Sequence, residues 1–270
     1  LTNLQTLLKA PALLATKGYL AADWCDGDDG LTFPVYNPAR GDVIANVADI
    51  SRTQTAKAIS IAEKAQKEWA ARPAKERSNL MRVWYDLMME NQEDLATILT
   101  AEQGKPIDEA KGEIAYGASF IEFFAEEAKR IYGETIPGYQ ADKKILVIKQ
   151  PIGVVTSITP WNFPNAMITR KLGPALAAGC SFVAKPAEDT PLSALAIAVI
   201  AERAGIPKGV LSIITSNKSQ IIGEEFCSNS KVRKLTFTGS TEVGKILLKQ
   251  GSSQVLKMSM ELGGNGPFIV

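Results

Sequence analysis

Residues 181–185 of the chain have the sequence SFVAK, and residues 191–205 follow as PLSALAIAVIAERAG. The first stretch is a short apolar run, typical of a strand that is buried on both faces, and the second has the length and composition of a helix. The same alternation fills residues 154–251. Short apolar strands separated by helices of about ten to fifteen residues favour a parallel sheet with helices on both faces. We therefore predict an α/β fold with a doubly wound parallel sheet.

The pattern upstream is mainly helical. Residues 1–49 indicate a short helix and then turn-rich strands, and Ser51 is the predicted N-cap of the next helix. We further expect helices from Pro73 through Leu99 and from about 107 to 132, a hairpin strand at 143–149, strands at 154–159, 181–185, 210–215 and 234–238, helices ending at Gly179 and covering 191–205, 221–226 and 241–251, and a last strand that starts near Pro267. These patterns divide the chain into residues 1–132, a hairpin at 133–152 and a sheet core at 153–270.

Composition limits the possible functions. Hydrophobic residues make up 46% of the 270 and charged residues 22%, as in soluble globular proteins. The formal charge of +1, from 30 basic and 29 acidic residues, gives no electrostatic case for nucleic acid or an anionic membrane surface. No apolar run approaches the roughly 18 residues of a membrane span. We therefore expect neither a nucleic-acid nor a membrane partner.

The cysteine and histidine content narrows the chemistry. The three cysteines, Cys25, Cys180 and Cys227, are far apart and form no disulfide framework, which favours a reducing compartment such as the cytoplasm. The chain has no histidine, so it contains no Ser–His or Cys–His nucleophile pair and no histidine metal site. We expect no metal. Any general base must be a carboxylate, Lys, Tyr or Cys.

Unusual residues follow the predicted strands, where ligands of such sheets bind. Residues 159–164 (TPWNFP) form a stiff loop in which Asn162 offers an NH2 donor suited to an oxyanion, although a rigid turn packed by Trp161 explains the same residues. Lys185 could donate to ribose hydroxyls. Glu188 could accept from a ribose 2′-hydroxyl and would repel a 2′-phosphate. An exposed ion pair before a helix is the alternative for these two.

Two later stretches add to this set. Residues 239–244 (GSTEVG) place backbone N–H groups and hydroxyls at a helix N-terminus, where anions bind, but Thr241 replaces the middle glycine of the dinucleotide fingerprint. In residues 259–266 (SMELGGNG), Glu261 lies between apolar neighbours. A carboxylate in such surroundings has a raised pKa and can act as a general base. A tight turn built on the paired glycines is the alternative.

Together, the segments TPWNFP, KPAE, FTGST and MELGGN resemble the aldehyde dehydrogenase superfamily in order and spacing. The likeness covers essentially the whole chain. Flanking stretches such as EQGKP (102–106) and AMITRK (166–171) are similar to the succinate-semialdehyde dehydrogenase branch. The resemblance implies a Rossmann-like cofactor domain and oxidation of an aldehyde to a carboxylate with NAD(P). It also implies a homo-oligomer assembled in part through a hairpin like 133–152.

The resemblance also implies roles for single residues. Asn162 would hold the oxyanion, Glu261 would activate the thiol or the hydrolytic water, and Arg170 would bind the distal carboxylate of an ω-carboxy aldehyde. Lys185 and Glu188 would bind the adenosine ribose, with Glu188 favouring NAD over NADP. The full set expected at the cofactor is Thr159, Trp161, Lys185, Glu188, Gly239, Ser240, Val243, Leu262 and Gly263.

The chain departs from the family pattern in several places. None of the three cysteines has the context of the family's nucleophile, which should lie past Val270, so we expect a fragment without the catalytic domain that is inactive alone. Gly266 stands where alanine or serine is more usual, and residues 215–219 (TSNKS) lack the glycine-rich sequence of many relatives. Two alternatives remain: a dinucleotide-binding module without catalysis, and a dehydrogenase for glutarate semialdehyde or another aldehyde.

Overall fold

The computed structural model describes residues 4–21 and 23–269. Its α-helices are α1 (Leu4–Leu7), α2 (Arg52–Ala71), α3 (Ala74–Glu90), α4 (Gln92–Gln103), α5 (Ile107–Glu127), α6 (Ala166–Ala177), α7 (Pro191–Arg203), α8 (Ser219–Ser228) and α9 (Thr241–Gly251). Its strands are β1 (Gly18–Leu20), β2 (Asp23–Cys25), β3 (Thr32–Tyr36), β4 (Val43–Ala48), β5 (Glu134–Pro137), β6 (Lys144–Val147), β7 (Val154–Ile158), β8 (Ser181–Lys185), β9 (Leu211–Ile213), β10 (Val232–Gly239) and β11 (Lys257–Leu262). None of the described helices is long and apolar enough to cross a membrane.

The described strands form one main sheet in the order β11-β10-β7-β8-β9-β1-β2. Strands β7 to β11 are parallel, whereas β1 and β2 extend the sheet in antiparallel fashion. The chain proceeds from β7 to β8 and β9 and then returns to place β10 on the other side of β7. This reversal creates a switch point between β7 and β10, and ligands of doubly wound sheets bind outside the carboxyl ends of the strands there.

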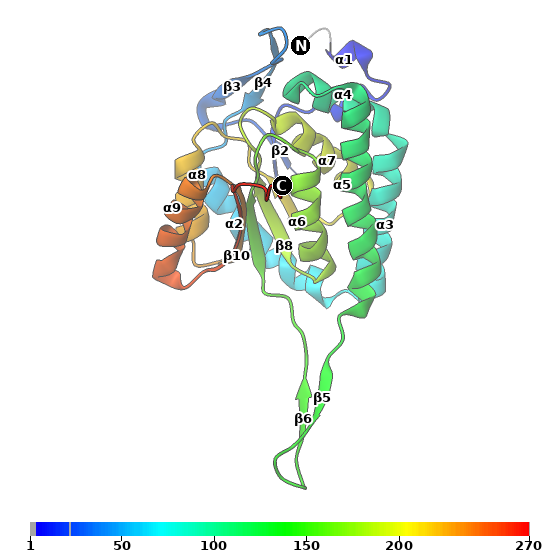
Figure 1. The fold of residues 1–270 in the computed structure, drawn as a ribbon, viewed down its shortest axis with the longest axis vertical. Coiled ribbons are helices and arrows are strands. Elements are labelled where there is room, and N and C mark those ends of the chain that lie inside the picture. The colour runs from blue at the N-terminus through cyan, green and yellow to red at the C-terminus, as the bar shows by residue number, and fades with distance from the viewer. Residues whose placement is uncertain (1–3, 22, 270) are drawn as a thin grey trace.

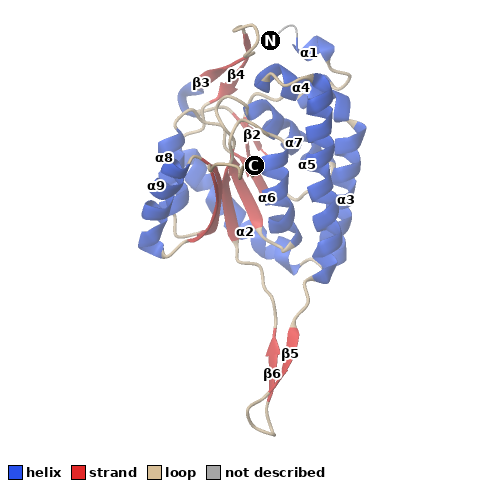
Figure 2. Cartoon of the chain, in the orientation of Figure 1, coloured by secondary structure: helices blue, strands red, loops and turns tan. Residues whose placement is uncertain are grey.

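Helices cover both faces of the sheet (Figures 1 and 2). Phe182 and Ala184 of β8 belong to a core shared with α3 to α7, whereas Val183 belongs to a second core shared with α2 and α8. Successive side chains of a strand point to opposite faces, so a continuous apolar run fills both cores. The predicted doubly wound fold is confirmed, although the joining of β1 and β2 to the parallel sheet was not anticipated.

Local sequence signals explain several helix ends. Ser51 caps α2 as predicted: its side chain accepts the backbone N–H of Gln54, and the Gln54 side chain accepts the N–H of Ser51. Pro191 occupies the first turn of α7, where its missing N–H costs nothing. Gly104 ends α4 with a φ of 90°, a left-handed conformation that glycine adopts without steric penalty.

Three predicted elements are wrong in their bounds. The helix expected from Pro73 through Leu99 is divided into α3 and α4 at Asn91, whose side chain donates to the carbonyl of Leu87. The helix expected to reach residue 132 ends at Glu127 and is followed by a 3-10 turn at Ala128–Arg130. The last strand does not start near Pro267 but spans Lys257–Leu262, and residues 263–269 have no regular secondary structure.

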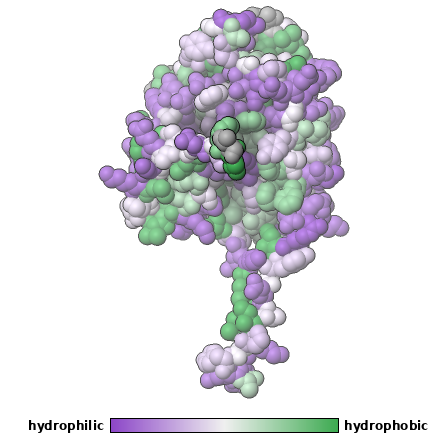
Figure 3. Space-filling model, in the orientation of Figure 1, coloured by the Kyte–Doolittle hydropathy of each residue, from purple (hydrophilic) through white to green (hydrophobic). Residues whose placement is uncertain are grey.

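The β5–β6 hairpin projects away from the body of the molecule (Figure 1). It joins α5 to the beginning of β7, so it leaves the sheet at the edge opposite the carboxyl ends of the parallel strands. Its strands are exposed throughout and carry apolar side chains such as Ile136 and Leu146 (green along the hairpin in Figure 3). The division at 1–132, 133–152 and 153–270 stays a prediction, and the main apolar core contains side chains from both of the larger parts.

Candidate active site

The β7–α6 loop carries Asn162 at one side of the switch point. Asn162 is exposed, and its Oδ1 accepts the backbone N–H of Phe163 at 3.1 Å. Because this bond occupies the oxygen, the side-chain NH2 remains available as a donor among the described residues. Trp161 beside it is 55% exposed. The arrangement suits an oxyanion donor, and the exposure of Trp161 does not support the alternative of a turn packed by this side chain.

The carboxyl end of β8 holds a compact polar cluster. Lys185 is buried, and its Nζ lies 2.8 Å from Glu188 Oε2 and 2.7 Å from Ser219 Oγ at the start of α8. The Ser219 hydroxyl also contacts the same Glu188 oxygen at 3.0 Å. Burial lowers the pKa of Lys185, although Glu188 opposes this effect. The expected pairing of a cation with a carboxylate is present before α7, as both interpretations require, but only its Glu188 end is exposed (45%), whereas Lys185 is 2% exposed.

The loop before Ser219 is held in place by Asp49, the residue after β4. Ser216 Oγ donates to Asp49 Oδ1 at 2.7 Å, and Lys218 Nζ lies 3.3 Å from the other oxygen of Asp49. Asp49 follows β4 and is buried. The 215–219 loop therefore owes its shape to an aspartate and not to the glycine-rich sequence that it lacks.

The helix α9 begins where the 239–244 stretch predicted an anion site. Ser240 is the N-cap, and its side chain accepts the N–H of Val243 at 3.2 Å. A Cβ on Gly244 would lie 2.6 Å from a methyl carbon of Leu262, so glycine lets α9 lie close to β11. Val243 and Leu262 are partly exposed beside this N-terminus. Gly239, Ser240, Val243, Leu262 and Gly263 therefore share one edge of the sheet.

Thr159 lies at the end of β7, next to the Lys185 strand. Its backbone N–H donates to the carbonyl of Lys185 at 3.2 Å. Its side-chain Oγ1 is buried and has no hydrogen-bond partner in the described structure. An unpaired buried hydroxyl costs free energy, so this atom is suited to a polar ligand.

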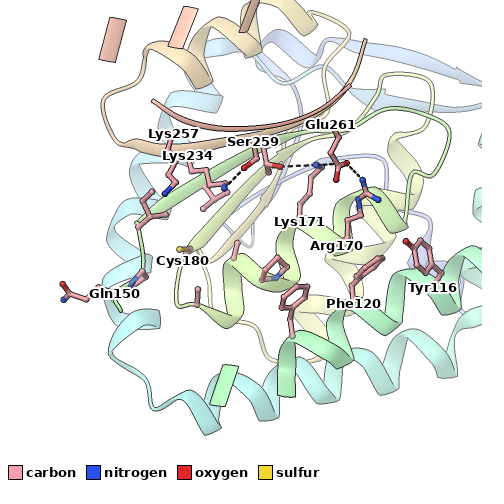
Figure 4. A pocket seen from close by; sticks show the side chains of 18 residues that line it. Tyr116, Phe120, Gln150, Arg170, Lys171, Cys180, Lys234, Lys257, Ser259 and Glu261 are labelled. Carbon is pink, nitrogen blue, oxygen red and sulfur yellow. Dashed lines mark hydrogen bonds and ion pairs between the residues drawn. The ribbon is translucent and has the colours of Figure 1, made fainter. Parts of the chain in front are cut away.

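Glu261 is the second-last residue of β11 and lies among polar partners. Thr238, its neighbour across the β10–β11 pair, donates to Oε2 at 2.5 Å, and Arg170 of α6 forms an ion pair with the same oxygen. Lys171 Nζ lies 3.6 Å away and also contacts Thr236 Oγ1 at 3.1 Å. The side chain is 48% exposed. Figure 4 shows Arg170 and Lys171 pointing toward Glu261 from the same helix.

These contacts correct the prediction of a raised Glu261 pKa. Partial burial raises the pKa, but the hydrogen bonds from Thr238 and Arg170 and the charge of Lys171 outweigh it, so the pKa lies below its ordinary value. The apolar sequence neighbours of Glu261 do not surround its carboxylate because alternate residues of a strand point to opposite faces. In this arrangement Glu261 is an ionised carboxylate held by cations.

A cavity of about 650 Å³ opens beside Glu261 (Figure 4). Its walls combine aromatic side chains of α5 with cations of α6, β10 and β11; they include Tyr116, Phe120, Phe124, Arg170, Lys171, Lys234 and Lys257. Asn162 is not among the lining residues, and no hydrogen bond or ion pair between described residues joins it to Glu261. The structure thus brings Arg170 and Glu261 together and places Asn162 on a separate loop.

The sequence analysis missed several members of this site. Lys171, Thr238 and Ser219 contact the predicted residues directly. Thr238 could have been found, because it precedes the GSTEVG stretch and lies on the strand next to Glu261 once the two strands are paired in register. Lys171 could not have been found in this way, because nothing in the sequence shows that this lysine next to Arg170 is buried. Ser219 could not be found either, because it contacts Lys185 across 34 residues of sequence and no local pattern reveals that contact.

The three cysteines lack the properties of a nucleophile. Burial raises the pKa of Cys25 and Cys180, and it raises the pKa of Cys227 to about 11. Cys180 lines the cavity of Figure 4 but is 3% exposed. Thiolates, and not thiols, attack carbonyl carbons, so none of these cysteines is activated here. No cluster of three or more metal-ligating His, Cys, Asp or Glu side chains occurs among the described residues.

This arrangement of strand-end loops is that of a known enzyme class. The sequence model of the aldehyde dehydrogenase family matches residues 24–270, and the chain therefore belongs to this family.

Individual relatives agree with the family assignment. The chain is 59% identical over 263 residues to glutarate-semialdehyde dehydrogenase of Pseudomonas aeruginosa, covering 97% of this chain and 54% of that protein. It is 55% identical to succinate-semialdehyde dehydrogenase [NADP(+)] of Escherichia coli, covering 96% and 53%. The solved succinate-semialdehyde dehydrogenase of Burkholderia pseudomallei superposes with a TM-score of 0.96 at 55% identity, covering 97% and 54%. The chain spans about half the length of the curated relatives it matches.

Proposed function

We propose that this chain forms the cofactor-binding half of an NAD-dependent enzyme that oxidises succinate semialdehyde to succinate. The observation that carries the proposal is the contact of Arg170 with Glu261 at the wall of the cavity. The Arg170 guanidinium already binds a carboxylate, that of Glu261, so its position and geometry suit a carboxylate ligand. A substrate with a carboxylate at its far end fits such a cavity better than an uncharged aldehyde.

The residues at the strand ends fit a bound dinucleotide. Lys185, Glu188 and Ser219 offer ribose hydroxyls both donors and acceptors, the buried Thr159 Oγ1 has a free hydrogen-bonding capacity, and the α9 N-terminus suits a pyrophosphate. When bound, the nicotinamide would accept the hydride removed from the aldehyde. The Glu188 carboxylate would repel a 2′-phosphate, which supports NAD as the cofactor, although the name of the E. coli relative carries NADP(+).

The side chains of this chain would do three things in the reaction. The Asn162 NH2 would donate to the oxygen of the aldehyde as it becomes negative. Glu261 would take a proton from the attacking thiol or from water. Arg170 would exchange its bond to Glu261 for one to the substrate carboxylate. This exchange removes one of the groups that lower the pKa of Glu261, so its pKa rises and it becomes a better base when the correct substrate is bound.

The attacking thiol would come from a cysteine outside these 270 residues, because Cys25, Cys180 and Cys227 are held in their neutral form. The proposal therefore concerns the whole enzyme, in the cytoplasm and as a homo-oligomer whose contacts include the exposed apolar hairpin.

Glutarate semialdehyde is the second candidate substrate. The relative with that name is 59% identical, a slightly higher value than for the succinate-semialdehyde enzymes. Glutarate semialdehyde differs from succinate semialdehyde by one methylene, and one methylene changes the binding free energy in an apolar site by about 1–3 kcal/mol. Arg170 would bind the distal carboxylate of either. A module that binds the dinucleotide without catalysis predicts no turnover of any aldehyde by the whole protein.

The test compares aldehydes that differ in charge. The whole enzyme is assayed with succinate semialdehyde, glutarate semialdehyde and butanal, each with NAD and with NADP. We expect the highest kcat/KM with succinate semialdehyde and NAD. Arg170→Met should lower kcat/KM for both ω-carboxy aldehydes about 100-fold and for butanal less than threefold, because a charged hydrogen bond is worth roughly 1.5–3 kcal/mol.

The matched control is Arg233→Met, which removes an exposed arginine of β10 that the cavity does not include. It should leave all three aldehydes unchanged. Equal losses for butanal and succinate semialdehyde in Arg170→Met would remove Arg170 from the substrate site. A preference for NADP would refute the role given to Glu188.

A further inference from the structure

A buried ion pair lies under the β7–α6 loop, on the side away from its exposed face. Lys105 follows Gly104 at the end of α4, and Glu113 is in the second turn of α5. Lys105 Nζ lies 2.5 Å from Glu113 Oε2; the lysine side chain is 9% exposed and the glutamate side chain is completely buried. Neither residue belongs to the cavity beside Glu261 or to the cofactor cluster.

Both members of this pair also bind the loop. Lys105 Nζ donates to the backbone carbonyl of Asn162 at 3.1 Å and lies 4.0 Å from the centre of the Phe163 ring, within the range of a cation–π contact. Glu113 Oε1 accepts the backbone N–H groups of Asn165 and Ala166 at 2.9 and 3.2 Å. The loop is therefore gripped at residue 162 by a cation and at residues 165–166 by an anion.

The sequence around Lys105 makes this geometry possible. The positive φ of Gly104 turns the chain at the end of α4, and Pro106 starts α5 immediately after, so Lys105 is fixed between two backbone constraints. Glu113 meets the start of α6, where the N–H groups of a first helical turn have no partner within the helix. A buried carboxylate at this point satisfies two of these groups and favours the positive end of the helix.

We propose that Lys105 and Glu113 are positioning residues that hold the Asn162 amide in place for oxyanion binding. The inference rests on the proposed function, because it assigns the two residues to the loop that would bind the aldehyde oxygen. An isolated pair of buried charges gives little stability over apolar residues of the same volume. Its four contacts with one loop indicate instead that the pair fixes where that loop lies. A displacement of about 1 Å at such a donor can reduce the rate about 100-fold.

The kinetic test uses the whole enzyme and the double variant Lys105→Met/Glu113→Leu, which removes both charges and leaves neither one unpaired. We expect kcat to fall about 10- to 100-fold while KM for NAD changes less than twofold, because the pair holds the loop at residues 162–166, beyond the expected cofactor residues Thr159 and Trp161. The control Arg82→Met/Glu122→Gln removes another ion pair of α5, at 2.9 Å, that does not contact the loop, and it should leave kcat unchanged.

A positioning role predicts dependence on Asn162. In an Asn162→Ala background, the same double variant should lower kcat less than twofold further, because the donor that it displaces is already gone. A full 10- to 100-fold loss in both backgrounds would overturn the proposal. An unchanged kcat when the double variant is made in the enzyme that retains Asn162 would also overturn it. If the double variant does not fold, Glu113→Gln keeps an acceptor for the two amides and should still lower kcat about fivefold or more.

A second readout does not depend on activity. Hydrogen exchange, followed by mass spectrometry, should be at least about tenfold faster at the amides of residues 165 and 166 in Lys105→Met/Glu113→Leu, with α7 unchanged. Unaltered exchange at these amides would overturn the proposed grip. Faster exchange in an enzyme that oxidises none of the tested aldehydes would uphold the grip and refute the proposed function alone.

Discussion

The β7–α6 loop and the carboxyl end of β11 each present one predicted catalytic side chain, but the structure holds them in different ways. Asn162 stands on a loop that a completely buried glutamate and its lysine fasten from below. Glu261 is half-exposed and is held by an arginine that could bind another carboxylate equally well. An oxyanion donor must stay where it is, whereas a base must gain and lose a proton. Burial of the Lys105–Glu113 pair keeps the oxyanion donor in place, and an exchangeable ion pair lets the base gain and lose a proton.

The largest expected difference concerns stability. Glu113→Leu leaves Lys105 as an unpaired buried cation, and such changes destabilise by about 3–5 kcal/mol. Glu261→Gln removes a partly exposed ion pair, which is worth about 0–1 kcal/mol. Urea unfolding of the whole enzyme, followed by circular dichroism, measures both values. Lys105→Met/Glu113→Leu should recover part of the loss in Glu113→Leu, and equal losses for Glu113→Leu and Glu261→Gln would erase the distinction between the two regions.

The next difference is in turnover. Asn162→Ala should lower kcat about 100- to 1000-fold, the usual cost of one oxyanion donor. Glu261→Gln should lower kcat about 100-fold or more, within the range for loss of a general base, while leaving cofactor binding unchanged. Steady-state rates and NAD binding by fluorescence test both. The control is Gln250→Ala, at a partly buried α9 residue that no hydrogen bond among the described residues joins to Asn162 or Glu261. A near-normal kcat in either variant would exclude that side chain from the chemistry.

The smallest effect is a shift in pH dependence. Arg170 contributes to the lowered pKa of Glu261, so Arg170→Met should raise that pKa. Since the base acts in its ionised form, activity with an uncharged aldehyde rises as the pH passes the pKa, and the acid limb of kcat/KM should move to higher pH. Glu261→Gln should abolish this limb. An acid limb that stays in place in Arg170→Met would show that the ion pair does not control the base.

The buried strands and the cofactor loops could be predicted from the sequence because their signals are local. SFVAK is apolar on both faces and occupies β8 as expected, and α9 spans Thr241–Gly251 as expected. The edge strand β11 was misplaced because KMSMEL alternates half-buried and exposed side chains, while the more apolar residues after Pro267 attracted the prediction. The antiparallel addition of β1 next to β9 depends on Tyr19 pairing with Ile213, a contact between distant parts of the chain.

The candidate site shows the same limit more clearly. Asn162, Lys185, Glu188 and Glu261 could be proposed from the sequence because their residue types and their positions after predicted strands are local features, and their roles stay predictions. Lys105 contacts the Asn162 carbonyl, Glu113 contacts the amides of residues 165 and 166 of the same loop, and Lys171 contacts Glu261. These contacts depend on how the helices pack on one another and on the sheet, which the sequence does not display. The direction of the Glu261 pKa shift was wrong for this reason: sequence neighbours suggested an apolar setting, and spatial neighbours provide cations.

The position of the β5–β6 hairpin determines which parts of the molecule a partner bound to it would approach. It leaves from the amino ends of the parallel strands, while every polar cluster described above lies at their carboxyl ends (Figure 1). The Lys185 cluster and the α9 N-terminus lie at the other end of β7 from the hairpin, whereas the cavity beside Glu261 extends toward it, with Gln150 and Ile152 in its wall. A second macromolecule bound to the hairpin would therefore leave the cofactor loops free but would lie next to one end of the cavity.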